Sequence, residues 1–302
     1  MATDYVVKGN PARLQHVITS DDTEVPTDAT GNVVVTITAS DGVTQLSTGN
    51  ATKIATGTYT YTAWTPAALD TDVTVTWVAT LPEGVTTDTT RVNVIGTWPF
   101  TIYDLRQWMT QLSSTTDFPV QPLRDARSQA IDWVHRLAPT ALVPSFKRHT
   151  VSRKDLSVTT ASTQVFGGQL RVVLPHRNVT AFKSLKIDGV SVSLSTLTLN
   201  GPTGIITGIF DSIYGNAYPY DYSQFVFEYE YGHSSCPPLA FQPLMALAAD
   251  LAMPQAGSPR ITSIASEIGF QRISTANSDG STGIPSLDAV LAVLGGGPGS
   301  GF

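Results

Sequence analysis

The chain has 302 residues, of which 14% are charged and 41% are hydrophobic, and its formal net charge is −6. This length suggests about two domains, and this composition is too apolar for a disordered chain. Residues 1–100 hold the whole excess of negative charge, with four basic residues against ten carboxylates. A mildly acidic domain of this kind does not attract nucleic acid.

The single cysteine, Cys236, excludes a disulfide within the chain. The residues after Met1 form neither a basic nor an apolar stretch, so no secretory signal is visible. No run of about 18 apolar residues predicts a membrane span. We therefore expect synthesis in the cytosol and no membrane partner.

Residues 5–95 alternate between polar and apolar side chains, and turn formers separate the alternating runs. The clearest predicted strands are 33–38, 58–64, 73–78 and 90–95, with weaker strands at 12–18, 43–47 and 52–55. Short alternating strands with frequent turns predict an all-β sandwich over residues 1–96. Trp64 and Trp77 are expected to fill its core.

Residues 97–302 are predicted to form a second domain. In several of its segments, apolar residues repeat at helical spacing. Helices are predicted at 101–112, 122–137 and 239–253, the first with a Thr101 cap and Asp104 placed for a capping box. The third helix is expected to present an apolar stripe. That stripe comprises Leu239, Leu244, Leu247, Ala248 and Leu251. We expect the three helices to pack as one small bundle.

A β-rich insertion, residues 149–231, separates the second and third helices. Its strand candidates are 170–174, 185–187, 190–194 and 225–231. Asp188-Gly189, between two of these runs, predicts a tight hairpin. Because helical segments flank the insertion, we expect it to project from the bundle.

The last part of the chain, residues 262–302, reads as an extended arm with one short helix. Pro285 suits the first turn of that helix, which is expected to end at Leu294. Its apolar side chains are Ile284, Leu287, Val290, Leu291 and Leu294. A helix of about ten residues is not stable alone, so this stripe needs a groove, either in its own bundle or in a partner.

Motifs for catalysis are missing from the sequence. There is no phosphate-binding Gly-x-x-x-x-Gly-Lys loop and no Gly-x-Ser-x-Gly elbow, and the five histidines lack metal-ligand spacing. Glu228 and Glu230 are predicted to lie on one face of a strand. They form either an acid/base pair for catalysis or part of a solvated strand surface. We expect no enzyme activity, no metal and no cofactor.

Charge is segregated within the second domain. Residues 147–187 hold eight basic residues against Asp155, a local net charge of +7, and residues 188–302 have a local net charge of −7. The two halves pair within one subunit, pair between adjacent copies of a ring, or contact nucleic acid. The candidate basic patch comprises Lys147, Arg148, Arg153 and Lys154.

Three segments carry a resemblance to a known family. They are Trp98–Leu137 with its Asp125–Trp133 stretch, Leu239–Met253, and Glu267–Ala276 followed by Asp279–Leu294 with a Thr-Gly-Ile-Pro-x-Leu-Asp-Ala-Val-Leu pattern. Residues 98–302 thereby resemble the portal adaptor proteins of tailed phages, also called head-to-tail connector or head-completion proteins. The N-terminal domain is similar to the immunoglobulin-like modules of many phage structural proteins.

The resemblance implies an α+β multidomain chain: an immunoglobulin-like sandwich, then a small helical bundle with a β-rich insertion and an extended C-terminal arm. It implies a structural virion protein at the head-tail junction, made in the host cytoplasm. Such a protein forms a homo-oligomeric ring, usually of twelve copies, below the portal protein. The ring extends the channel for packaged DNA, which it contacts non-specifically, and offers a platform for a stopper or tail terminator.

In this reading, the apolar stripe of the arm lies at a portal or subunit interface, and the basic patch faces a neighbouring subunit or DNA. Two alternatives remain open. The N-terminal sandwich binds a host glycan or the capsid surface, or the chain is a tail-terminator or tail-tube component. Tail-tube proteins are chiefly β, so the predicted helices disfavour the second alternative.

Overall fold

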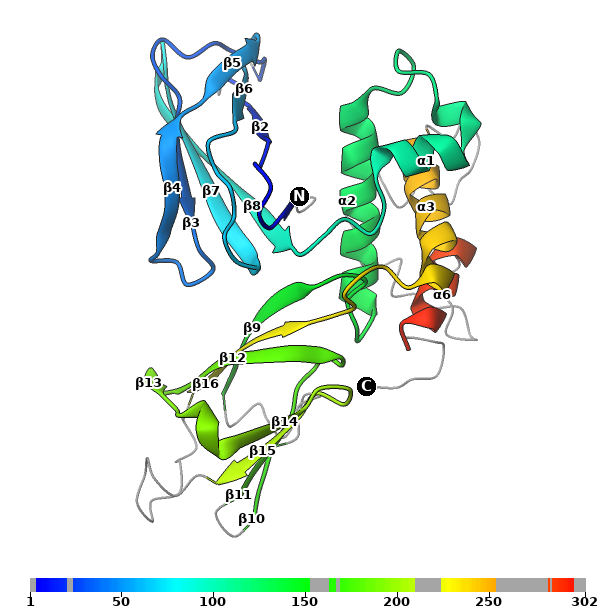
Figure 1. Ribbon diagram of the computed structural model, residues 1–302. Coiled ribbons are helices and arrows are strands. Elements are labelled where there is room, and N and C mark those ends of the chain that lie inside the picture. Colours follow the sequence, from blue (N-terminus) through cyan, green and yellow to red (C-terminus); the bar gives the residue numbers. More distant parts are fainter. Residues whose placement is uncertain are drawn as a thin grey trace. The chain divides into compact units, whose positions relative to one another are not determined.

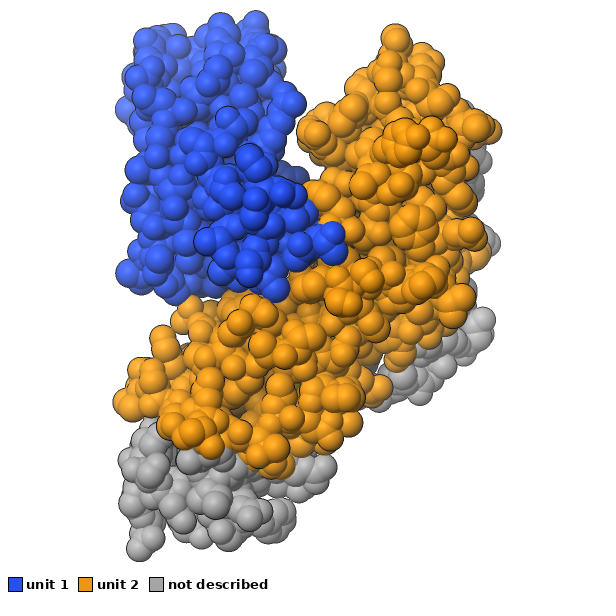
Figure 2. Space-filling model, viewed as in Figure 1, with its two compact units in different colours: residues 1, 3–97 blue, residues 2, 98–302 orange. Residues whose placement is uncertain are grey.

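The computed structural model describes residues 4–20, 24–152, 163–166, 169–209, 224–253, 282 and 284–295. The chain divides between Thr97 and Trp98 into two compact units, unit 1 and unit 2 (Figure 2). It is a mixed α+β protein in which β-sheet predominates. Of the expected arm, 262–302, only residues 282 and 284–295 are described.

The described part of unit 1 consists of two β-sheets (Figure 1). One has five strands in the order β1-β8-β7-β3-β4, and the other has three in the order β2-β6-β5. The strands are β1 Asp4–Val7, β2 Leu14–Val17, β3 Val34–Thr38, β4 Gln45–Asn50, β5 Thr52–Ala55, β6 Thr58–Tyr61, β7 Asp70–Leu81 and β8 Gly84–Ile95. β1 runs parallel to β8, and the sequence pattern does not predict this strand.

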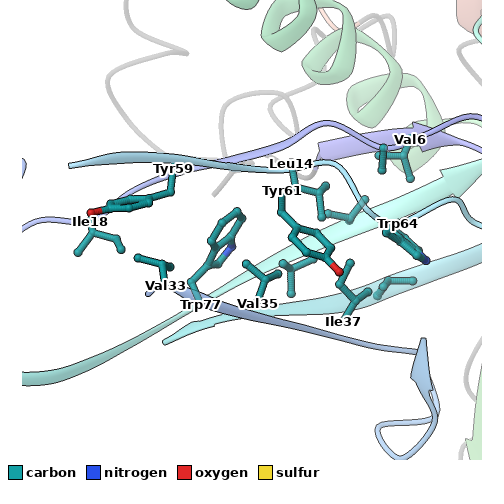
Figure 3. Packing of buried hydrophobic residues seen from close by; sticks show 14 of the residues in the cluster. Val6, Leu14, Ile18, Val33, Val35, Ile37, Tyr59, Tyr61, Trp64 and Trp77 are labelled. Carbon is teal, nitrogen blue, oxygen red and sulfur yellow. The ribbon is translucent and has the colours of Figure 1, made fainter. Parts of the chain in front are cut away.

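The core of unit 1 is formed by the inward-facing side chains of these strands. The expectation that Trp64 and Trp77 fill it is confirmed, since they are 4% and 1% exposed. In Figure 3, Trp77 and Val35 lie opposite Tyr59 and Tyr61. Every second residue of β7 is buried from position 73 onward, so the strand has one inner and one outer face, as alternation requires.

The helices of unit 2 pack as one bundle although the β-rich segment separates them in sequence. They are α1 Ile102–Trp108, the 3₁₀ turn η1 Thr110–Leu112, α2 Val120–Leu137, α3 Pro238–Ala252 and α6 Pro285–Val293. α2 packs against α3, α6 packs chiefly against α3, and α1 contacts both α2 and α3. Figure 1 shows α2, α3 and α6 side by side.

The capping chemistry of the helices is as predicted from the sequence, but the helix bounds differ from the predicted ones. Thr101 and Asp104 form the expected capping box. The predicted helix 101–112 is interrupted, because Met109 is extended, and the η1 turn that follows carries Leu112 into the core at 0% exposure. α2 begins two residues early, at Val120, because proline is tolerated in a first turn, where amides lack helical acceptors.

α3 differs from the prediction at its first turn. Leu239 was assigned to the apolar stripe, but its side chain is 77% exposed. Leu244, Leu247 and Ala248 are buried as expected. The inward face of α3 therefore begins after Leu239.

The β insertion contains two four-stranded sheets with a shared core. Their orders are β13-β12-β16-β9 and β10-β11-β15-β14. The elements are β9 Ser145–Ser152, β10 Thr163–Phe166, β11 Gln169–Val173, β12 Val179–Ile187, β13 Val190–Ser191, the 3₁₀ turn η3 Leu194–Thr196, β14 Leu197–Asn200, β15 Ile205–Ile209 and β16 Gln224–Tyr231. The insertion therefore starts at Ser145, four residues before the predicted boundary at 149.

The predicted hairpin at Asp188-Gly189 is confirmed. Asp188 and Gly189 have φ angles of 51° and 81°, the left-handed pair that a two-residue type I′ loop requires. Ile187 pairs with Val190 across the loop.

Hydrogen bonds connect the insertion to the segment that follows α2. Arg177 N donates to Pro139 O at 2.8 Å, and His233 N donates to Ala141 O at 3.2 Å. Gly232 lies so close to this segment that an added Cβ would be 2.4 Å from Val143 O. The insertion and the bundle thus share a backbone junction inside unit 2.

Candidate interaction surfaces

The apolar stripe of α6 is the first predicted interaction site. Leu287, Val290, Leu291 and Leu294 are 0%, 0%, 6% and 4% exposed, and Ile284 is 8% exposed. Pro285 occupies the first turn as expected, and spacings of three and four residues place the stripe on one side of the helix. The predicted apolar stripe is therefore present on α6, and its side chains are buried.

Its cover is the chain's own bundle. α6 contacts α3 and, less extensively, α2. The assignment of Ile284 and the stripe to a portal or subunit interface stays a prediction, and in this structure the helices of unit 2 supply the groove. Of the two grooves left open by the sequence, the structure contains the one in the same chain.

The predicted basic patch is divided by strand geometry. Lys147 and Arg148 are neighbours on β9, so their side chains point to opposite faces of the sheet. In the ladder with β16, Lys147 pairs with the buried Tyr229, and Arg148 pairs with Glu228 on the other face. The remaining members, Arg153 and Lys154, lie outside the described residues.

Two acidic residues of β16 neutralise basic residues of neighbouring strands. The Arg148 guanidinium lies 3.4 Å from the Glu228 carboxylate, and the Lys183 ammonium lies 2.9 Å from the Glu230 carboxylate. Ser184 Oγ also donates to Glu228. For these groups the basic and acidic halves pair within one subunit, and the two glutamates are engaged in ion pairs.

A histidine-tyrosine cluster, which the sequence pattern does not predict, occupies the inner face of the same sheet. His176 Nδ1 lies 2.6 Å from Tyr229 Oη, and the His176 ring lies 4.1 Å from the Tyr231 ring between centroids. Burial raises the pKa of both tyrosines, so their phenols stay protonated. Alternation along β16 places both tyrosines inward, but His176 lies in a loop whose position no local pattern encodes.

Histidine protonation is opposed throughout this region. Burial, then the charge of Lys147, lowers the pKa of His176 from 6.5 to about 3. Burial lowers the pKa of His135 to about 4. Both histidines are therefore neutral at pH 7.

These depressed pKa values predict acid sensitivity of unit 2. In the unfolded chain each histidine binds a proton near pH 6.5, whereas the folded chain does not, so stability is complete above pH 6.5 and is lost as pH falls toward 4. Each histidine contributes a slope of up to about 1.4 kcal/mol per pH unit. Urea unfolding at pH 7.5, 6 and 4.5 measures how the free energy of unfolding depends on pH. His176→Gln is expected to flatten the profile, and an unchanged profile would contradict this assignment.

Groups suited to chemistry are few in the described part of the chain. Cys236 is half-buried, and burial raises its thiol pKa to about 11, which disfavours the reactive thiolate at neutral pH. Among the residues that the structure describes, no three histidine, cysteine or acidic side chains are grouped so that they could hold a metal ion. Within the same residues, no helix combines the length and apolarity needed to cross a membrane.

Comparison with known proteins assigns no family. No family model matches the chain, and no curated protein matches it. Among solved structures, CopC from Methylosinus trichosporium OB3b is 15% identical over 31% of this chain and 84% of that chain, with a TM-score of 0.22. A chimeric titin Z1Z2 is 16% identical over 74% of this chain and 83% of that chain, with a TM-score of 0.20.

Latent PorU from Porphyromonas gingivalis is 11% identical over 78% of this chain and 23% of that chain, with a TM-score of 0.24. All of these TM-scores lie under 0.5, so the likenesses carry no argument about fold or function.

Proposed function

We propose that the chain is a structural protein of a tailed-phage neck, a portal adaptor that forms a ring below the portal and joins head to tail. The ring extends the channel for packaged DNA and presents a platform to the next neck or tail protein. Unit 1 is, in this proposal, an immunoglobulin-like sandwich, supported by two sheets that enclose one core. The chain acts without a cofactor and is not an enzyme.

One observation carries the proposal: a single helical bundle is built from both sides of a β insertion. α2 ends at Leu137 and α3 begins at Pro238, yet the two helices pack together. The bundle is made of the segments whose sequence resembles portal adaptors, 98–137, 239–253 and the described part of 279–294.

The position of α6 removes one argument for this function. Since its stripe is buried in the chain's own bundle, the helix gives no reason to expect a partner groove. The ring contacts must then use another surface. α1 exposes Tyr103 and Trp108, at 70% and 40%, and aromatic side chains of this kind are enriched at protein interfaces.

The test is assembly on the portal. The purified chain is mixed with the portal protein of the same phage, and the complex is measured by mass photometry and electron microscopy. Twelve copies of a 32.2 kDa chain would add about 386 kDa below the portal. A chain that stays monomeric with the portal and is missing from purified virions would overturn the proposal.

A double variant, Tyr103→Ser with Trp108→Ser, examines the ring contact separately. We expect it to fold as the parent does but to bind the portal without closing a ring. A matched variant at an exposed site of unit 1, Val43→Ser, should assemble normally, since Val43 is 85% exposed and lies far from α1 in the sequence.

A second candidate function concerns unit 1. It has its own core, and its sequence carries the whole excess of negative charge, so it can serve as a binding module for a host or capsid surface. Deletion of residues 1–96 is then expected to reduce adsorption or particle stability while leaving neck assembly intact. Unchanged adsorption and unchanged particle stability would exclude this role.

A further inference from the structure

The outer face of the five-stranded sheet of unit 1 is rich in threonine. Strands β4, β3, β7 and β8 are neighbours in this sheet (Figure 1). Inward residues such as Val35, Val75 and Trp77 are at most 1% exposed, so alternation turns the residues between them outward. Six outward threonines, none of them buried, form what we call the threonine face. They are Thr36, Thr38, Thr48, Thr74, Thr76 and Thr89.

Strand register arranges these side chains in rows. Thr48 pairs with Thr36, and Thr36 pairs with Thr76. Thr76 pairs in turn with Thr89, so one row of threonines crosses four strands. The next row contains the two remaining threonines, which are also in register. Since neighbouring strands lie about 4.8 Å apart and alternate residues of a strand lie about 6.8 Å apart, the hydroxyls repeat in two directions.

Most of these hydroxyls are free to meet a ligand. Thr48 Oγ1 donates to Val35 O at 3.1 Å and lies 3.4 Å from Thr36 Oγ1. Among the described residues, the hydroxyls of Thr74, Thr76 and Thr89 have no hydrogen-bond partner. Each can both donate and accept. Because a β-branched side chain has few rotamers, little entropy is lost when such a hydroxyl is ordered by a ligand.

The threonine face is neutral although unit 1 is acidic. None of its six positions carries a charge, and Arg91 beside it lies 3.7 Å from the Asp72 carboxylate. Depletion of charged residues is typical of the centre of an interface. Residues 1–100 have a net charge of −6, which repels polyanions. The partner that matches this face is therefore neutral and rich in hydroxyls.

We propose that the threonine face binds a neutral polysaccharide of the host surface through its rows of hydroxyls. The proposal rests on the second candidate function, in which unit 1 is a binding module. A sugar polymer repeats donors and acceptors along its length, as the face does. A single neutral hydrogen bond contributes little, so binding depends on several of them forming together.

The test measures binding of the full chain to three neutral polysaccharides. They are insoluble cellulose, in a pull-down, and dextran and mannan, by retardation in affinity gels; alginate is the polyanionic comparison. The parent chain should bind at least one neutral polysaccharide and should not bind alginate. The triple variant Thr36→Val, Thr76→Val and Thr89→Val keeps the side-chain shape but removes three hydroxyls. We expect at least about tenfold weaker binding.

The matched control is the triple variant Thr52→Val, Thr56→Val and Thr62→Val, which removes three exposed hydroxyls of unit 1 outside the threonine face. It should bind as the parent does. If the first triple variant aggregates, Thr76→Lys places a charge in the middle of the face and should abolish binding. Binding of the parent to none of the three neutral polysaccharides, or equal binding by folded Thr76→Lys, would overturn the inference.

Two further measurements separate this inference from other outcomes. Self-association of the parent in analytical ultracentrifugation that Thr76→Lys removes would show that the face binds a second copy, and would overturn the inference. Adsorption that falls on deletion of residues 1–96 but not in Thr76→Lys would leave the binding-module role intact and remove this face as its site. Unchanged adsorption after the deletion would remove both.

Discussion

Replacing Leu287 by alanine is expected to lower the free energy of unfolding of unit 2 by about 2–5 kcal/mol, the range for a fully buried leucine. Leu287 is 0% exposed, and its helix, α6, packs against α3 and α2. A nine-residue helix has little stability of its own, so its docking depends on this burial. Urea unfolding followed by circular dichroism measures the loss.

Val293→Ala is the matched control, because Val293 lies on the same helix but is 36% exposed. We expect it to change stability by no more than about 0.5 kcal/mol. Equal effects of the two substitutions would show that α6 is not docked in solution as the structure describes. The stripe would then again be available to a partner.

Replacing Trp77 by alanine is expected to destabilise unit 1 by about 3–5 kcal/mol, the range for a buried aromatic residue. Trp77 is 1% exposed in the middle of β7, and the His16 ring stacks on it at 5.4 Å between centroids. Because the buried cluster around Trp77 is built from residues of unit 1, we expect the unfolding transition of this unit to move. Differential scanning calorimetry resolves the two transitions.

Val85→Ala provides the comparison for Trp77→Ala. Val85 is the second residue of β8 and pairs with Thr80 in the same β7–β8 hairpin, but its side chain is 69% exposed. Val85→Ala should change the free energy of unfolding of unit 1 by no more than about 0.5 kcal/mol. If Trp77→Ala instead moved both transitions together, the two units would not unfold independently.

Elements with a strong local pattern were predictable. Alternation located β3, β7 and the end of β8, and helical spacing located α2, α3 and α6. The capping box at Thr101 and the loop at Asp188-Gly189 follow from the chemistry of a few adjacent residues. Such signals need no knowledge of distant contacts.

Features that depend on tertiary contacts were not predictable. β1 has the burial pattern exposed-buried-buried-buried, which lacks alternation, and it exists through parallel pairing with β8. The groove for α6 is made by helices encoded far upstream. Its location follows from packing, although the stripe itself was visible in the sequence.

The basic patch was predicted from charge alone, because Lys147 and Arg148 belong to a run of eight basic residues in 147–187. Charge does not say which face of a strand a side chain takes. β9 in fact begins at Ser145, and its alternation separates them. An earlier strand boundary would have predicted the separation.

The β insertion has a consequence for synthesis on the ribosome. α2 is complete at Leu137, but α3, which covers its apolar face, begins only at Pro238. At translation rates of about 5–20 residues per second, α2 waits several seconds or longer for this partner. Unit 1 faces no such delay, since all its strands precede the bundle. A nascent chain stalled between these helices should therefore carry a finished N-terminal unit and a helix that recruits chaperones.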